Sequence, residues 1–113
     1  MSDKKLPKLN WGKLEGLVPT VTQDFKTGMV LMVGFMNKRA LQKTLKERKV
    51  TYFSRTRKKL WTKGETSGNF QLVKEILQDC DNDTLLIKVK QIGNVCHTGN
   101  KTCFFKKIYG KKR

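Results

Sequence analysis

The chain has 113 residues, of which 37% are hydrophobic and 9% aromatic, enough for one small domain and too few for two of ordinary length. Its 25 lysines and arginines outnumber its 9 aspartates and glutamates, so the formal net charge is +16. Such a surface attracts polyanions, whether nucleic acid, anionic lipid or a multiply phosphorylated small molecule. The cations are spread along the whole chain, however, which is more typical of a solvated surface than of one docking face. Charge alone therefore assigns no function.

The beginning of the chain and its apolar runs argue against export and membrane insertion. Residues 1–10 carry lysines with no apolar run behind them, so we expect a loose basic tail and no secretory signal. The longest nearly apolar stretch, Met29 to Met36, is far shorter than the roughly 20 residues of a membrane span. Three cysteines without an export signal favour metal binding or catalysis over disulfides. We expect a cytoplasmic protein in which residues 11–113 form a single domain.

The first half of the domain is predicted to hold two strands, one helix and a third strand. Thr20 to Phe25 and Gly28 to Phe35 read as strands around a turn at residues 26–28, where glycine can take a positive φ. Asn37 is a good N-cap, and an apolar stripe at helical spacing follows it, so we expect one main helix near residues 37–49. Val50 to Ser54 is rich in β-branched and aromatic residues and predicts a strand. The members of the helical stripe are Ala40, Leu41, Thr44 and Leu45.

The second half is predicted to be strands and loops. Residues 63–69 contain two glycines and several hydroxyl groups, which is typical of a loop. Phe70 to Gln78 and Thr84 to Gln91 read as strands, and the alternation of Leu85, Ile87 and Val89 with other residues favours a sheet with one buried face. A last strand is expected from Thr102 to Tyr109. Strands thus predominate, and the fold is mainly β, or α+β by count.

The segment from residue 79 to residue 83 carries three carboxylates, Asp79, Asp81 and Asp83, on a chain that is poor in acids. Their mutual repulsion would be relieved by a hard cation such as Mg²⁺, which prefers oxygen ligands. An EF-hand is excluded, because Thr84 stands where that loop needs Gly and Lys90 where it needs Glu. If the segment is extended, the three aspartates face one way and Cys80 the other. The alternative is a plain acidic turn between two strands.

The cysteines and the single histidine form a second group of candidate ligands. Cys80, Cys96 and Cys103 offer three thiolates, and catalytic zinc sites use three protein ligands and leave the fourth position to water. His97 directly follows Cys96, so it is either a fourth ligand or a free acid or base. No pair of C-x-x-C knuckles is present, which disfavours a zinc finger. The alternative is three buried free cysteines that act as small hydrophobes.

Residues 52–68 interleave aromatic rings, cations, hydroxyl groups and glycines. Trp61 is a candidate to stack on a base, and Arg55 and Arg57 are candidates to bind phosphates. Thr66 and Ser67 in the glycine-containing loop offer hydroxyl donors. The same composition suits a surface for single-stranded nucleic acid, or a basic hairpin whose Trp simply packs.

Taken together, these segments resemble the phosphoribosyl-AMP cyclohydrolase family over nearly the whole chain. The resemblance begins at Gly16-Leu17-Val18-Pro19 and continues through Ser54-Arg55-Thr56-Arg57. It is carried further by the run from Leu60 to Gly68, by Asp79-Cys80-Asp81-Asn82-Asp83, and by Cys96-His97-Thr98-Gly99 with Cys103-Phe104-Phe105.

The resemblance implies an obligate homodimer with a pseudobarrel-like sandwich of short strands. It implies one Zn²⁺ per subunit at the interface, held by Cys80 from one chain and by Cys96 and Cys103 from the other, and Mg²⁺ held by Asp79, Asp81 and Asp83. The implied reaction is hydrolysis of the N1–C6 bond of the adenine ring of phosphoribosyl-AMP, the third step of histidine biosynthesis, with His97 as the candidate proton shuttle. The two phosphates of this substrate need cations, for which Arg55, Arg57 and Lys63 are the candidates. In some relatives a second enzyme domain follows, and we expect a stand-alone cyclohydrolase here.

Two rival interpretations belong to other classes of protein. A basic zinc module that binds nucleic acid would explain the charge and the Trp-Arg segment, but the three aspartates would repel phosphates. A metal-stapled dimerisation domain without activity would keep zinc and open no purine ring. We therefore expect a phosphorylated nucleotide as the ligand, and neither a membrane nor a nucleic acid as a partner.

Overall fold

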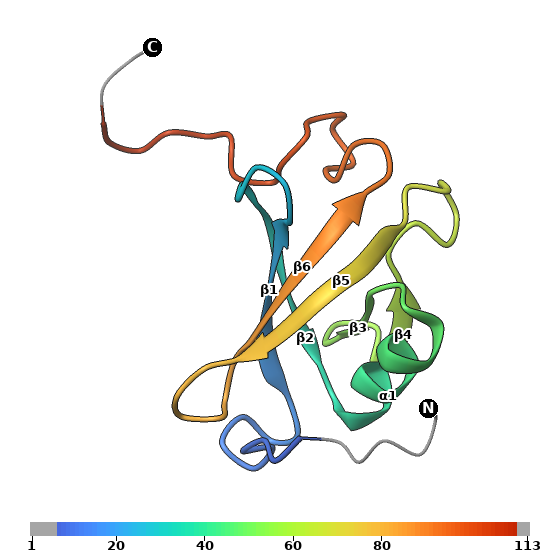
Figure 1. Ribbon diagram of the computed structural model, residues 1–113, viewed down its shortest axis with the longest axis vertical. Coiled ribbons are helices and arrows are strands. Elements are labelled where there is room, and N and C mark those ends of the chain that lie inside the picture. The colour runs from blue at the N-terminus through green and yellow to red at the C-terminus, as the bar shows by residue number, and fades with distance from the viewer. Residues whose placement is uncertain (1–6, 111–113) are drawn as a thin grey trace.

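The computed structural model describes residues 7–110, which form an α+β domain of six strands and one helix around a single core (Figure 1). Residues 1–6 of the predicted basic tail lie outside the described residues. The elements are β1 (Val18–Asp24), β2 (Val30–Met36), α1 (Lys38–Glu47), β3 (Thr51–Ser54), β4 (Lys59–Thr62), β5 (Gln71–Gln78) and β6 (Leu85–Gln91).

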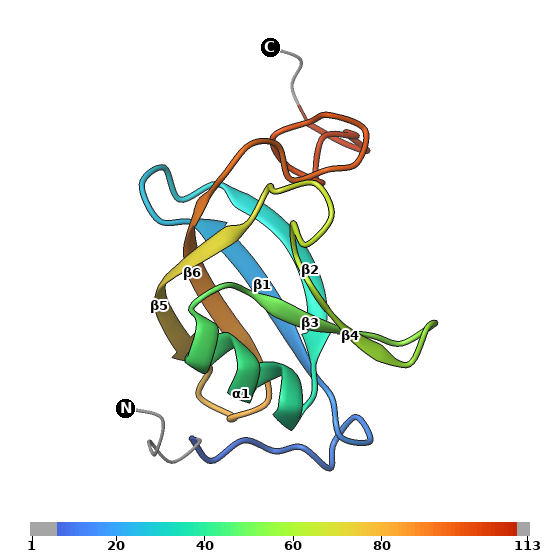
Figure 2. The same ribbon diagram turned by 90° about the vertical axis from the view of Figure 1, so that its right-hand side faces the viewer.

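Four of the strands make one mixed sheet in the order β2-β1-β6-β5, in which only β1 and β6 run parallel. The predicted alternation in β6 is confirmed, because Leu85, Ile87 and Val89 are all buried. The turn predicted between β1 and β2 is also confirmed, with Gly28 at φ 80°. Helix α1 and the antiparallel hairpin of β3 and β4 cover the inner face of this sheet (Figure 2).

The hairpin closes the core between the edges of the sheet. The N–H of Val50 donates to the carbonyl of Gln71 on β5 at 3.0 Å, and β3 packs against β2. The ring of Tyr52 is fully buried, and its hydroxyl hydrogen-bonds Thr22 at 2.6 Å and donates to Gln71 Oε1 at 2.7 Å. One side chain of the small sheet thus ties two strands of the large one, β1 and β5.

Helix α1 begins where the sequence predicts. The side chain of Asn37 accepts a hydrogen bond from the N–H of Ala40 at 2.8 Å, and the left-handed Arg48 ends the helix through its N–H to the carbonyl of Thr44. Ala40, Leu41 and Thr44 are buried, but Leu45 of the predicted apolar stripe is 39% exposed. No helix among residues 7–110 has the length and hydropathy needed to cross a membrane.

One prediction of secondary structure is wrong, and one strand was not predicted. The predicted strand from Thr102 to Tyr109 is irregular: Thr102 and Cys103 bond to the carbonyls of Val30 and Leu31 on β2, but the segment forms no strand. Strand propensity depends on a neighbouring strand to pack and bond against, which this segment lacks in the described part of the chain. The sequence also did not predict β4, a short basic strand that exists through its pairing with β3.

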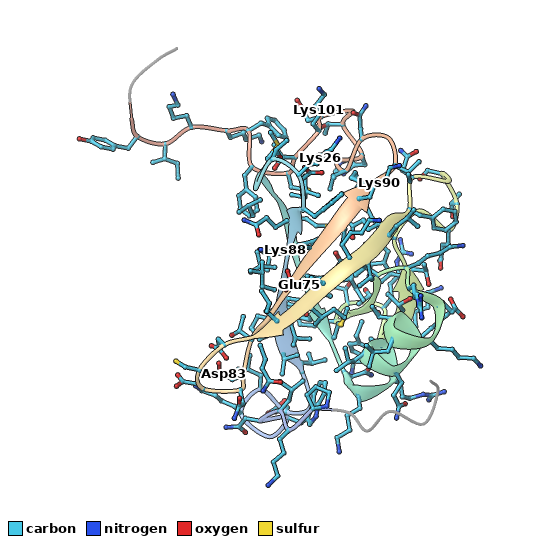
Figure 3. All side chains as sticks on the ribbon, viewed as in Figure 1. Lys26, Glu75, Asp83, Lys88, Lys90 and Lys101 are labelled. Carbon is cyan, nitrogen blue, oxygen red and sulfur yellow. The ribbon has the colours of Figure 1, made fainter. Side chains whose placement is uncertain are left out.

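The outer face of the four-stranded sheet carries both apolar and charged side chains. One apolar row crosses all four strands in register, through Val33, Val21, Leu86 and Leu77. Val33 and Leu77 at its two ends are 47% and 41% exposed. Glu75 and Lys88 form an ion pair of 3.7 Å on the same face (Figure 3). Within the described residues, no element covers this face.

Candidate functional site

The acidic turn, residues 79–83, connects β5 to β6 and brings its three carboxylates together. Of the two conformations that the sequence left open, the structure has the turn and not the extended segment. Asn82 is left-handed at φ 60°, and Asp79 Oδ1 accepts hydrogen bonds from the N–H groups of Asp83 and Thr84. One oxygen each of Asp79, Asp81 and Asp83 lies within 4.8 Å of the other two. Three converging carboxylate oxygens fit a hard cation such as Mg²⁺.

Lys13 contacts the acidic turn through Asp83, and the sequence pattern did not predict this contact. Its Nζ is 2.5 Å from Asp83 Oδ2. The hydrogen bond from Lys13 lowers the pKa of Asp83, and the same bond raises the pKa of Lys13. No local pattern in the sequence predicts this pair, because 70 residues separate its members.

The thiols of Cys96 and Cys103 form a second cluster, the thiol pair, after the opposite end of β6. A turn places Cys96, whose N–H donates to the carbonyl of Asn100 at 3.1 Å, and β2 places Cys103, whose N–H donates to the carbonyl of Leu31 at 2.8 Å. The two thiols lie close enough for each to shift the pKa of the other. Two adjacent sulfurs provide part of a tetrahedral zinc site.

The two thiols of the pair have different surroundings. The Thr98 hydroxyl donates to Cys96 Sγ at 3.0 Å and lowers the pKa of that thiol, and the positive charge of Lys63 adds to the effect. Burial raises the pKa of Cys103, and the neighbouring Cys96 raises it further. Cys96 is therefore the thiol that ionises more readily, and the main cause is Thr98, to which the sequence pattern assigned no role of its own.

Lys63 and the loop of residues 63–69 lie beside the thiol pair. Lys63 Nζ donates to the carbonyl of Val95 at 2.5 Å, and the Asn69 amide donates to the carbonyl of Asn94 at 3.2 Å. Gly64 at φ 89° is required here, because a Cβ on it would lie 2.4 Å from the backbone of Asn69. Thr66 and Ser67 in this loop are exposed, as is His97, so one end of the domain presents most of the predicted polar side chains to solvent.

The other predicted substrate contacts lie farther from this end. Trp61 is half-buried, with its ring centroid 5.1 Å from that of Tyr52, so part of its surface packs against the core. Arg55 and Arg57 are exposed at the tip of the β3–β4 hairpin, where the Arg55 guanidinium lies 4.1 Å from the centre of the Phe35 ring. The structure thus separates these two arginines from Lys63 by the length of β4.

The third predicted zinc ligand, Cys80, does not lie near the thiol pair of its own chain. Cys80 is exposed in the acidic turn, and strand β6 runs from that turn to the end that carries Cys96 and Cys103 (Figure 1). The seven residues of β6 span roughly 20 Å at ~3.3 Å per residue. Within one chain the acidic turn and the thiol pair are therefore separate.

The chain is thus a small α+β domain with two sets of candidate metal ligands, the acidic turn and the thiol pair, at opposite ends of one sheet. A family model described as Phosphoribosyl-AMP cyclohydrolase matches residues 32–105, and the chain belongs to this family.

The relatives of the chain fall into two kinds. The Phosphoribosyl-AMP cyclohydrolase of Clostridium beijerinckii is 50% identical over 105 residues, which cover 93% of this chain and 96% of that protein. The protein of the same name from Clostridium botulinum is 51% identical over 106 residues, 94% of this chain and 97% of that protein. The Histidine biosynthesis bifunctional protein HisIE of Haemophilus influenzae is 59% identical over 99 residues, 88% of this chain but 45% of that protein. The chain thus spans about half the length of the bifunctional relatives it matches.

Proposed function

We propose that this chain hydrolyses the N1–C6 bond of the adenine ring of phosphoribosyl-AMP in histidine biosynthesis, in the cytoplasm. The observation that carries the proposal is the match along nearly the whole length of two relatives named for this activity. In the reaction the oxygen of water bonds to C6, the C6–N1 bond breaks, and N1 takes up a proton.

Zinc held by the thiol pair and by Cys80 of a second copy would supply Lewis-acid activation of water. Three thiolates leave such a centre with a net negative charge, which the neighbouring Lys63 ammonium offsets. His97 is exposed beside Cys96 and would carry the proton between water and N1. The phosphates would bind Lys63, Thr66 and Ser67 at this end, together with Arg55 and Arg57, and Trp61 would contact the base.

The acidic turn would hold Mg²⁺ through Asp79, Asp81 and Asp83. The donor set supports this assignment, since it offers only oxygens from these three side chains, within 4.8 Å of one another. A divalent cation would balance most of their negative charge.

The separation of Cys80 from the thiol pair supports a homodimer, because one chain alone does not bring the three thiols together. If two copies pack the outer faces of their sheets together, related by a twofold axis across the apolar row of Val33, Val21, Leu86 and Leu77, each acidic turn approaches the thiol pair of the other copy. The row would then be buried at the interface. Complete removal of zinc should convert the dimer to monomer or unfold it, as measured by light scattering with chromatography. A dimer of unchanged mass would contradict shared ligation.

Two substitutions test the activity. Cys96→Ala should lose zinc and turnover, whereas His97→Ala should keep zinc and lose roughly 10²- to 10⁴-fold in turnover, as expected for a general acid or base. Turnover is followed by the absorbance change on phosphoribosyl-AMP, and metal content by elemental analysis. Lys101→Met, an exposed change in the same loop, is the matched control and should remain active. Full turnover in both test variants would refute the proposal, and zinc retention without ring opening in the unmodified protein would favour a dimerisation domain.

A further inference from the structure

The segment before β1 is hydrogen-bonded to the acidic turn and to the end of β5 at two points that precede Lys13 in the chain. The N–H of Asn10 donates to the carbonyl of Asn82 at 2.6 Å, and the side-chain amide of Gln78 donates to the carbonyl of Lys8 at 3.0 Å. The loop then folds on itself, with the N–H of Gly16 bonded to the carbonyl of Trp11 at 2.6 Å. These bonds hold the loop over the turn, so that Lys13 is presented to it.

Lys13 occupies the carboxylate that is least open to solvent. The side chain of Asp83 is 14% exposed, whereas that of Lys13 is 56% exposed. Both carboxylate oxygens of Asp83 accept hydrogen bonds. Lys13 Nζ donates to Oδ2, and the Thr84 hydroxyl donates to Oδ1 at 3.3 Å. A cation that binds the three carboxylates together must therefore share Asp83 with an ammonium group.

We propose that Lys13 sets the affinity of the acidic turn for a divalent cation by competing with it for the carboxylate of Asp83. This inference rests on the cation site of the proposed function. The sign follows from the charges: the lysine and the bound cation are both positive and both close to Asp83, so each weakens the binding of the other by the same factor. Cation binding consequently releases Lys13 and loosens the loop of residues 10–16 from the turn.

Calorimetric titration with Mg²⁺ alone tests the competition in the full chain. Lys13→Met removes the ammonium from an exposed side chain, and should tighten Mg²⁺ binding roughly tenfold, the scale of two screened charges a few ångströms apart. Lys26→Met is the matched control, because Lys26 is exposed at the other end of the sheet from Asp83 and its loss changes the net charge equally (Figure 3). This control should bind Mg²⁺ like the unmodified protein. Asp81→Asn should weaken binding in either background.

Hydrogen exchange provides a readout independent of affinity. Saturating Mg²⁺ should speed exchange of the amides of residues 10–16 in the unmodified protein, where Lys13 is released, and should change it less in Lys13→Met. Equal Mg²⁺ affinity of Lys13→Met and the unmodified protein, with binding lost in Asp81→Asn, would overturn the role of Lys13 and leave the cation site intact. Absence of Mg²⁺ binding from the unmodified protein and every variant would overturn the cation site as well. Ring-opening activity is measured separately, so that failure of the cation site is distinguished from failure of the proposed activity.

Discussion

The proposed sharing of zinc ligands between two chains can be tested by mixing inactive variants. Cys80→Ala removes the ligand at one end of the sheet, and Cys103→Ala removes a ligand at the other end, roughly 20 Å away along β6. Both side chains are exposed, so neither change opens a cavity in the core. Each variant alone should lose zinc and turnover, because every site in its dimer lacks one thiolate.

A mixed dimer of these two variants regains one complete site. Cys80 of the Cys103→Ala chain meets Cys96 and Cys103 of the Cys80→Ala chain, whereas the second site lacks two ligands. Random exchange of subunits makes half of the dimers mixed, and each has one of its two sites intact, so turnover should recover to about one quarter of the unmodified value. Zinc content should recover to the same fraction.

The assay follows ring opening by absorbance after the two proteins are mixed under conditions of subunit exchange. The negative control is a mixture of Cys96→Ala with Cys103→Ala, in which both changes lie in the thiol pair, so that no combination of chains completes a site. Mass spectrometry of the intact complexes verifies that mixed dimers have formed. If such dimers are present and the Cys80→Ala mixture stays inactive, or if Cys80→Ala alone is fully active, shared ligation is refuted.

Three further predictions concern stability. Tyr52→Phe should lower the free energy of unfolding by about 1–3 kcal/mol in urea titrations, because it leaves buried Gln71 without its hydroxyl donor, whereas the exposed Tyr109→Phe should have no effect. Asp24 accepts hydrogen bonds from the backbone and hydroxyl of Thr27, which lower its pKa from 3.8. Its contribution to stability is therefore present above pH 3.8 and lost as the pH falls through the lowered pKa. Asp24→Asn should consequently make the melting temperature fall less steeply as the pH is lowered through this range, and an unchanged fall would contradict the reasoning. Asn37→Ala should lower the free energy of unfolding by about 1 kcal/mol, because the N-cap of α1 is lost. Asn37→Asp keeps a capping oxygen and should largely retain stability in the same urea titration.

Local interactions explain why much of the fold was predictable from the sequence. Helix α1 is capped by Asn37 three residues from its bonding partner, and the alternation in β6 marks its buried face directly. The three aspartates lie within five residues, so their carboxylates are close together in a turn, the alternative that the sequence left open beside an extended segment. For the same reason Cys96 and His97 were identified from their adjacency, although their roles remain predictions.

Features that depend on distant parts of the chain were decided only by the tertiary structure. Strand β4 exists because β3 pairs with it, and Thr102 to Tyr109 is not a strand because no strand of the described residues pairs with it. The sequence alone named three cysteines as one ligand set, but the length of β6 separates Cys80 from the other two. Lys13 reaches Asp83 across 70 residues. Chain composition and spacing determine which groups can bind a cation, whereas the sheet determines which of them meet, because strand length and pairing fix distances that no local pattern encodes.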